Sequence, residues 1–486
     1  MDFYGFSAPG TGVNADGLRT EKAWKDYFDC GFNVMNLTGK NSYRGEGWQG
    51  SNTQKCFEFA RNLGVKKIMM DDSRIYDLAD DYKDKLVGES EDCRFKTEEE
   101  LDAFIEECMK EYIFDPLFYG LRLRDEPQYC HLKAYGETYR SIKRVAKKLG
   151  KDYVHIDMNL LPISSDVYRV CPELKELTAT ELYTRYVEDY LRVTEANCIS
   201  VDNYPYHLTP YGGRFFEGYY SNFQILKRVC DKYNAKMIFT IATFEMEAPD
   251  EGGLAGYRRV VNVNEMMLQM NSALGFGAQE ITFYTYVTMA LSQKSPYLSR
   301  DGSSCITSDG TKTWIWHYTK AAIQHAKKLE KVLEEYAFKG AKILLHESVK
   351  DIEIPYCADL PENLRTVESY YLSSWPKKMP DGSVTTADFD NSYSADRIKG
   401  IEFDKDVLLY THFQNKQDNS QMFMFLNIND KSYKFNPASM KLKVDFGGEV
   451  DKIKMLKEND FEEVEIPNGT LKTELSQGEA VWVIIE

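Results

Sequence analysis

Eight short apolar segments recur over the first 290 residues, and an amphipathic stretch of helical length follows each one. The segments begin near residues 3, 32, 66, 119, 153, 197, 236 and 280. Parallel strands need such a crossover helix between them, so the alternation predicts a (β/α)8 TIM barrel over residues 1–335. A doubly wound open sheet is the alternative, but it usually carries a GxGxxG loop after its first strand. The glycines of SAPGTGVNADG lack that spacing, which favours the barrel.

The pattern changes to short alternating segments with turn signals over residues 336–486, as in AKILLHES, MFMFLNIND and AVWVIIE. Alternation with a period of two is typical of antiparallel strands with one buried face. We therefore predict a small all-β sandwich domain after the barrel. A polar, loop-rich insertion near residues 356–400 is expected to reach back toward the barrel mouth.

Charge and composition restrict the partners. The chain has 76 acidic and 60 basic residues, a net charge of -16, which argues against nucleic acid and anionic membranes because both bind basic surfaces. The sequence contains no apolar run of about 18 residues, so no membrane span is expected. The first residues lack the basic and apolar regions of a signal peptide, so a cytoplasmic protein is expected. The ten cysteines include no CxxC pair and are expected to be reduced core thiols.

Acidic and aromatic residues end most of the predicted barrel strands. In a barrel these ends meet on one face, where active sites are built. Hydrolysis of a glycosidic bond needs two carboxyl groups on that face, one to protonate the leaving oxygen and one to attack or to activate water. The strand-end residues are Asp71, Asp72, Asp125, Glu126, His155, Asp157, Asn159, Asp202, Tyr204, Tyr206, Glu245, Glu247, Tyr284 and Tyr286.

The fourth strand, in YGLRLRDEPQYC, supplies the predicted acid, Glu126. Counted back by twos, Glu126 shares a face with Arg124 and Arg122, while the leucines between them face the helices. Glu126 is therefore expected to point into the barrel, where burial and a neighbouring acid would raise its pKa. A DEP sequence alone is more often a helix-capping turn, but eight strands around it favour the catalytic interpretation.

LRLRDEP also resembles the N/D-E-P ending of strand four in the clan A glycoside hydrolases. MNLLP, ISVDNYPY, NEMMLQMNSALGFGAQEITFYTY and SDGTKTWIWHYTKAAIQ are similar to segments of a large group of bacterial barrel glycosidases. Together these motifs cover roughly residues 110–335. The resemblance implies a retaining glycosidase without a cofactor, with Glu126 as general acid/base and a nucleophile at the end of strand seven.

The second carboxylate has three candidates. Glu245, near the end of strand seven, is favoured as nucleophile; Asp202, on strand six, is the alternative, followed by Glu247. If Phe244 faces the barrel, Glu245 needs a β-bulge to turn inward. Substrate-binding roles are expected for Asp202, Tyr204, Asn159, Asp72, Asp125, Tyr284 and Tyr286, although each aromatic could equally be a core residue.

Other classes fit the sequence less well. Only His155 and His207 lie at strand ends, without HxH or HxxxH, so no metal site is expected. The GxSxG motif of a serine nucleophile is absent. A non-catalytic carbohydrate-binding barrel is the main alternative to an enzyme. In both cases the partner is an oligosaccharide or a small glycoside, and a homo-oligomeric state is compatible with the sequence.

Overall fold

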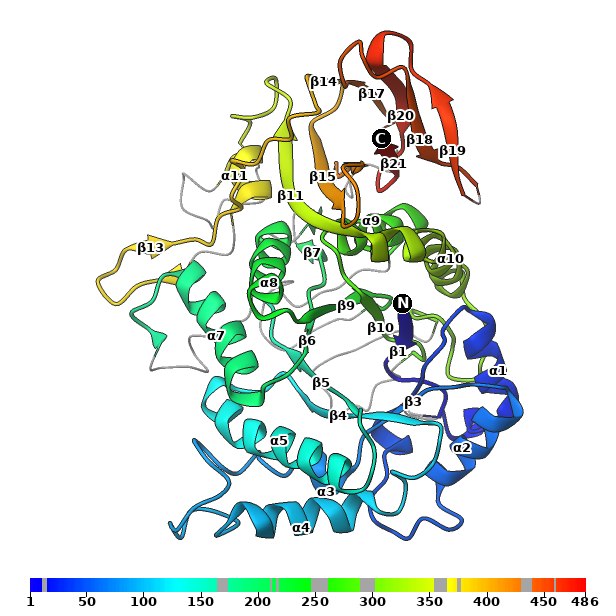
Figure 1. Ribbon diagram of the computed structural model, residues 1–486, viewed down its shortest axis with the longest axis vertical. Coiled ribbons are helices and arrows are strands. Elements are labelled where there is room, and N and C mark those ends of the chain that lie inside the picture. Colours follow the sequence, from blue (N-terminus) through cyan, green and yellow to red (C-terminus); the bar gives the residue numbers. More distant parts are fainter. Residues whose placement is uncertain are drawn as a thin grey trace.

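Eight parallel strands, each followed by at least one helix, form a barrel over the first 335 residues of the computed structural model (Figure 1). Hydrogen bonds join the strands in the order β1, β10, β9, β6, β5, β4, β3, β2. The N–H of Asn33 also donates to the carbonyl of Phe3 (3.0 Å), so β1 returns beside the chain that enters β2 and nearly closes the sheet. The predicted (β/α)8 barrel is confirmed.

The structure describes residues 1–10, 15–163, 174–209, 212–215, 218–245, 261–288, 302–353, 365–373, 377–429, 439–458 and 460–486. The barrel strands are β1 (Asp2–Gly5), β2 (Met35–Leu37), β3 (Ile68–Met70), β4 (Phe118–Asp125), β5 (His155–Leu160), β6 (Cys198–Asp202), β9 (Lys236–Ala242) and β10 (Glu280–Tyr284). The helices are α1 (Glu21–Asp29), α2 (Asn52–Asn62), α3 (Ser73–Tyr76), α4 (Glu98–Met109), α5 (Leu132–Lys148), α7 (Ala179–Thr194), α8 (Tyr219–Tyr233), α9 (Val263–Gly275) and α10 (Trp314–Glu335). None of these helices is both long and apolar enough to cross a membrane.

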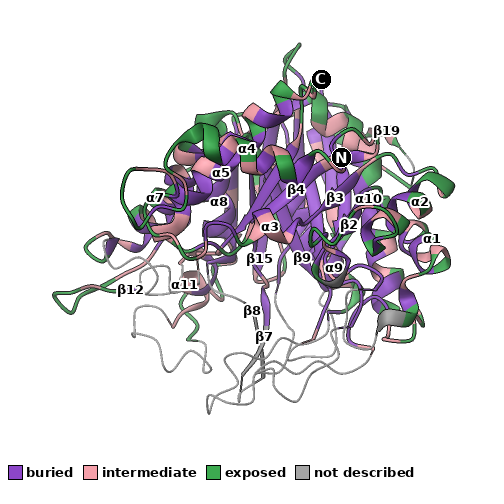
Figure 2. Cartoon of the chain, turned by 90° about the horizontal axis from the view of Figure 1, so that it is seen from below, coloured by how far each residue is buried: buried purple, intermediate pink, exposed green. Residues whose placement is uncertain are grey.

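Local sequence signals account for several helix ends. Thr178 and Glu181 form a capping box at the start of α7, and Asn262 and Glu265 form one at the start of α9. The α8 helix ends at Asn234, whose φ of 51° is the left-handed conformation in which helices commonly stop. Figure 2 shows the result, buried strands enclosed by helices whose outer faces reach solvent.

The two faces of the barrel strands differ in chemistry. Side chains that point outward, such as Leu121, Ile156 and Phe239, pack against the helices in one continuous hydrophobic core. The inside is more polar than the branched aliphatic layers that usually fill such barrels. For example, the hydroxyls of Thr240 and Thr282 lie 2.6 Å apart there. The interior can therefore hold buried charged groups below the C-terminal ends of the strands.

The described residues that follow α10 form the predicted β-domain. A six-stranded antiparallel sheet, β11-β15-β16-β21-β18-β19, packs against a three-stranded sheet, β14-β17-β20, through a hydrophobic core of its own. Its strands are β11 (Tyr336–Leu345), β14 (Gly400–Phe403), β15 (Val407–Asn415), β16 (Gln421–Asn427), β17 (Met440–Asp445), β18 (Lys452–Leu456), β19 (Phe461–Glu465), β20 (Thr470–Leu475) and β21 (Ala480–Ile485). Two packed antiparallel sheets are the predicted sandwich.

Polar contacts join the two domains. Asn271 on α9 is fully buried; its Nδ2 donates to the carbonyl of Gly478 (3.0 Å), and its Oδ1 accepts from the indole N–H of Trp482 (3.4 Å). The segment between β11 and β14 adds helix α11 (Val367–Leu372) and the hairpin of β12 (Lys377–Lys378) and β13 (Val384–Thr385). This hairpin extends beside the start of α7 (Figure 1), where Lys377 Nζ donates to the carbonyls of Lys175 (2.7 Å) and Leu177.

Candidate active site

A β-bulge in β4 changes how the strand presents its acidic end. The register with β5 shifts between Arg122 and Arg124, so that Asp125 lies opposite Asn159 and Arg124 opposite Met158. Arg124 consequently points outward, where its guanidinium contacts Asp77 (3.3 Å). The simple alternation expected from the sequence is thus wrong at Arg124, because the extra residue of a bulge reverses the facing of the residues after it.

Glu126 comes directly after this bulge and ends the strand. Its backbone is left-handed (φ 49°), a conformation that costs a non-glycine residue energy and is concentrated at functional sites. The turned backbone is held by its N–H, which donates to the carbonyl of Asn159 (2.7 Å). Pro127 is buried behind it. The local fold therefore fixes the direction of Glu126 after the regular strand has ended.

Asn159 connects two carboxylates near Glu126. Its Nδ2 donates to Asp125 Oδ1 (3.1 Å) and to Asp202 Oδ1 (2.8 Å), from strands on either side of β5. Its Oδ1 accepts from the hydroxyl of Ser200 (3.1 Å), which fixes the orientation of the amide. One side-chain nitrogen cannot serve both carboxylates unless they lie close together. Asn159 is thus a clamp that holds two acids side by side at the mouth.

Arg122 lies beneath the clamp. It is 8% exposed, its guanidinium stacks 4.0 Å from the centre of the Phe6 ring, and its Nη2 donates to Asp125 Oδ1 (2.7 Å). Its positive charge also acts on the buried carboxyls of Asp71 and Asp157. Burial raises the pKa of Asp71 to about 7, although the nearby guanidinium opposes that shift.

Glu126 and Asp202 form an electrostatically linked pair. Glu126 is open to the mouth on one side, yet loss of hydration is the largest cause that raises its pKa, to about 8, followed by the charges of Asp202 and Asp125. Burial also raises the pKa of Asp202, but hydrogen bonds from Asn159 and Tyr204 favour its ionised form. A proton shared by the pair therefore resides mainly on Glu126.

Three aromatic rings lie beside the pair. Tyr204 and Tyr284 are nearly parallel, with ring centres 5.9 Å apart, and Phe244 meets each ring edge-on at 5.0 Å. Tyr286 is not in this group; it is fully buried and packs against Tyr27 (4.9 Å), away from the mouth. Of the aromatic residues predicted to bind substrate, Tyr204 and Tyr284 are therefore brought to the carboxyl pair.

The remaining predicted site residues are Glu245, Glu247 and Asp72. Phe244 packs inward, and the N–H of Glu245 donates to the carbonyl of Ser303 (3.0 Å), while Glu247 lies outside the described residues. Asp72 caps α3 by accepting from the backbone N–H of Arg74, and it accepts two further hydrogen bonds from the Arg74 guanidinium (3.0 and 2.6 Å), so its carboxylate is engaged behind the strand. Its neighbour Asp71 is the acid that acts on Arg122.

Sequence reasoning placed Asp71 at a strand end but gave the binding role to Asp72. Adjacent residues at the end of a strand face opposite sides, so only one of the two can point inward. The alternation of Met69 and Met70 could have identified the inward-facing acid. Met69 belongs to the small core inside the barrel, and Asp71, two residues later, lies on the same face of the strand. Arg122 was already expected on the inward face of its strand, but no role was predicted for it.

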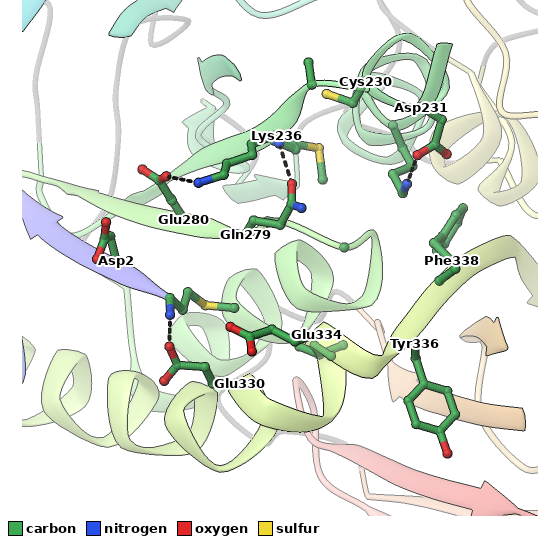
Figure 3. A pocket seen from close by; sticks show the side chains of 18 of the residues that line it. Asp2, Cys230, Asp231, Lys236, Gln279, Glu280, Glu330, Glu334, Tyr336 and Phe338 are labelled. Carbon is green, nitrogen blue, oxygen red and sulfur yellow. Dashed lines mark hydrogen bonds and ion pairs between the residues drawn. The ribbon is translucent and has the colours of Figure 1, made fainter. Parts of the chain in front are cut away.

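A cavity of about 570 Å³ lies at the opposite end of the barrel, where the strands begin (Figure 3). Two of the acids that line it are paired with lysines, Glu280 with Lys236 (3.5 Å) and Asp2 with Lys67 (2.7 Å). Barrel enzymes place their chemistry at the C-terminal ends of the strands, so this space is not the candidate active site. Across the described part of the chain, no group of three or more Asp, Glu, His or Cys side chains could hold a metal ion.

No protein-family model and no curated protein sequence matches the chain. Solved structures do match it. One called a glycoside hydrolase is 11% identical with a TM-score of 0.49, and the match covers 99% of this chain and 91% of that one. A glycoside hydrolase family 5 protein from Bacteroides vulgatus is 9% identical (TM-score 0.48; 99% and 88% covered). A GH27 β-L-arabinopyranosidase from Geobacillus stearothermophilus is 10% identical (TM-score 0.43; 99% and 95% covered). The neighbours of this chain among solved structures thus include several glycoside hydrolases, all at low identity.

Proposed function

We propose that the protein is a glycoside hydrolase that cleaves its substrate at the mouth of the barrel, with Glu126 as the general acid. The observation that supports this is the pairing of two carboxyl groups with unequal proton affinity at the C-terminal ends of β4 and β6. Glycosidases use such a pair, in which the group with the raised pKa donates the proton and the ionised group faces the anomeric carbon.

The residues at the mouth have distinct roles in this reaction. Glu126 protonates the glycosidic oxygen as the bond to the anomeric carbon breaks, and Asp202 stabilises or attacks the oxocarbenium-like carbon. Asn159 keeps Asp202 ionised by donating to it. The parallel rings of Tyr204 and Tyr284 offer an apolar face to a sugar ring. The backbone N–H of Glu126 donates to the carbonyl of Asn159, which holds the main chain at this position before the substrate binds.

Asp202 is the preferred second carboxylate, and Glu245 is the alternative. Asp202 supplies the largest of the charge effects on Glu126. The inward position near Glu245 is taken by Phe244. Both acids nevertheless lie at the ends of barrel strands, and a nucleophile on β9 is what the resemblance to clan A implies.

The first experiment is an assay against 4-nitrophenyl glycosides of common sugars in both anomeric forms, followed by the variant Glu126→Gln. An activated aryl leaving group needs little protonation, so this variant should keep more activity on aryl glycosides than on a natural disaccharide. Equal loss on both substrates, with substrate binding intact, would count against Glu126 as the acid. Binding without turnover by the wild type would identify a carbohydrate-binding barrel instead.

The second experiment separates the two candidate nucleophiles. In Asp202→Ala and Glu245→Ala, azide can occupy the space of the lost carboxylate and attack the anomeric carbon. If Asp202 is the nucleophile, azide should restore turnover of an activated glycoside in Asp202→Ala and yield a glycosyl azide of inverted configuration. If azide restores turnover only in Glu245→Ala, Glu245 is the nucleophile.

A further inference from the structure

The charged groups around Glu126 also indicate which charge a bound sugar can carry. This inference rests on the proposed function. Of the charges that act on Glu126, Asp202 and Asp125 are negative and Arg122 is positive. Asp202 and Asp125 are held together by the Asn159 amide, so neither can move away from an incoming ligand. A substrate group placed beside Glu126 therefore meets two fixed carboxylates.

Arg122 is not available to bind an anionic sugar. It is buried and stacked on Phe6, and its Nη2 is committed to Asp125. Its charge is further offset by Asp71 and Asp157, which lie on the neighbouring strands β3 and β5. Arginine recognises a carboxylate through two free N–H groups presented side by side, and this guanidinium is enclosed by acids instead.

Two carboxylates retain capacity to accept hydrogen bonds. The bonds to Asp125 from Arg122 and Asn159 both end on Oδ1, and the side chain is 48% exposed, so Oδ2 can accept from a ligand. Asp71 is 7% exposed, and its Oδ1 has no partner among the described residues. A carboxylate oxygen only accepts hydrogen bonds, so the natural partner of the exposed Asp125 Oδ2 in a sugar is a hydroxyl group and not another carboxylate.

We propose that the site takes a sugar without an acidic substituent, bound by hydroxyl groups that donate to Asp125, and that it discriminates against the uronic acid of the same configuration. The negative charge of the uronic acid carboxylate would lie close to the carboxylates of Asp125 and Asp202, which would repel it. The clamped acid pair thus selects by charge as well as by shape.

The test compares the best 4-nitrophenyl glycoside of the wild type with the corresponding uronide, in which the hydroxymethyl group is replaced by a carboxylate. The uronide should have a kcat/KM at least about tenfold lower, equivalent to about 1.4 kcal/mol. Asp125→Asn should reduce this ratio several-fold because it removes one charge while keeping the side-chain shape. Glu334→Gln, at the far cavity, is the matched control and should leave the ratio unchanged.

A uronide that is turned over as well as its parent sugar, or an unchanged ratio in Asp125→Asn, would overturn the inference. If no glycoside is hydrolysed, the proposed function has failed, and the charge preference is then tested by binding. Saturation-transfer NMR with the neutral monosaccharide and its uronate should show weaker binding of the uronate. Equal or tighter binding of the uronate would contradict the charge selection independently of any activity.

Discussion

At the scale of single residues, the main feature is that one proton resides on Glu126, which lies among several other acids. Glu126 keeps it because partial loss of hydration, together with the negative charges of Asp202 and Asp125, raises the pKa of its carboxyl. Asn159 donates a hydrogen bond to each of those two carboxylates, and Arg122 donates one to Asp125. The chain therefore separates the pKa values of similar side chains through their neighbours, as acid–base enzymes generally do.

The pH dependence of activity can be derived from this arrangement. A general acid must be protonated, and the raised pKa of Glu126 means that activity should persist through neutral pH and fall as the pH rises through about 8. In Asp125→Asn a negative neighbour is lost, so the pKa of Glu126 falls, and the alkaline limb of kcat/KM should move to lower pH by about one unit. A limb that stays in place or moves to higher pH would show that another group controls it.

Several of these residues could be predicted from the sequence because the end of a buried strand is recognisable as a polar residue after an apolar run. Asp125, Glu126, Asn159, Asp202, Tyr204 and Tyr284 all come after apolar runs, a pattern that predicts them at one face of the barrel. The partners of each residue could not be predicted, since hydrogen bonds such as that from Asn159 to Asp202 join residues more than 40 positions apart. Tyr286 illustrates the limit, because its pattern is that of a strand end while its ring lies in the core.

At the scale of elements, strand register decides what the clamp can do. Asn159 on β5 lies directly opposite Ser200 on β6, so the serine hydroxyl reaches the amide oxygen. This bond sets which end of the amide faces the acids. The bulge in β4 has the complementary effect, because it brings Asp125 opposite the same asparagine. Such a bulge has no sequence signature in LRLRDEP, which is why alternation misplaced Arg124.

Ser200 offers a test at this scale. In Ser200→Ala the amide of Asn159 loses the bond that orients it, and we expect kcat/KM to fall by about three- to tenfold, as for the loss of one buried hydrogen bond worth about 1 kcal/mol. Ser200→Thr keeps the hydroxyl and should retain most of the activity. The alkaline limb of Ser200→Ala should also shift, which a purely structural defect would not cause.

The stereochemical outcome depends on the distance between strand ends. Retaining glycosidases hold their carboxyl groups about 5 to 5.5 Å apart, and inverting enzymes hold them about 6.5 to 9.5 Å apart. Our prediction is retention through a covalent glycosyl-enzyme. Proton NMR of the first product formed from an aryl glycoside should show the anomeric configuration of the substrate. Initial formation of the opposite anomer would mean that the second carboxylate activates water.

At the scale of the whole molecule, the barrel and the β-domain share buried polar contacts. Asn271 accepts from Trp482 and donates to the carbonyl of Gly478 across the interface, while His325 on α10 lies 2.8 Å from its Oδ1. The sequence predicted both folds from their different periodicities. The contact between the two domains could not be predicted, because nothing in the sequence of α9 indicates that its asparagine pairs with a distant tryptophan.

Asn271→Leu should therefore destabilise the whole chain. The substitution keeps the branched shape but leaves the carbonyl of Gly478 and the donors around it without a partner, which costs about 1 to 3 kcal/mol for each buried group. We expect a lower unfolding temperature by calorimetry, with barrel and β-domain melting at more separate temperatures. Trp482→Phe removes the indole N–H and also shrinks a fully buried side chain, so it should lower the unfolding temperature through a cavity in addition to the lost hydrogen bond. An unfolding temperature of Asn271→Leu equal to that of the wild type would show that Asn271 is not the main contact.

The hairpin of β12 and β13 has a consequence for how such a protein can change over evolutionary time. Lys377 belongs to the second half of the chain, yet it fastens the loop that enters α7 in the first half, and Thr385 accepts from the N–H of Ala179 at the same point. A recombination event that exchanged everything after residue 335 would remove this fastening from the loop. The two halves are consequently expected to be inherited together, and chimeras that move only one of them should need the hairpin transplanted as well.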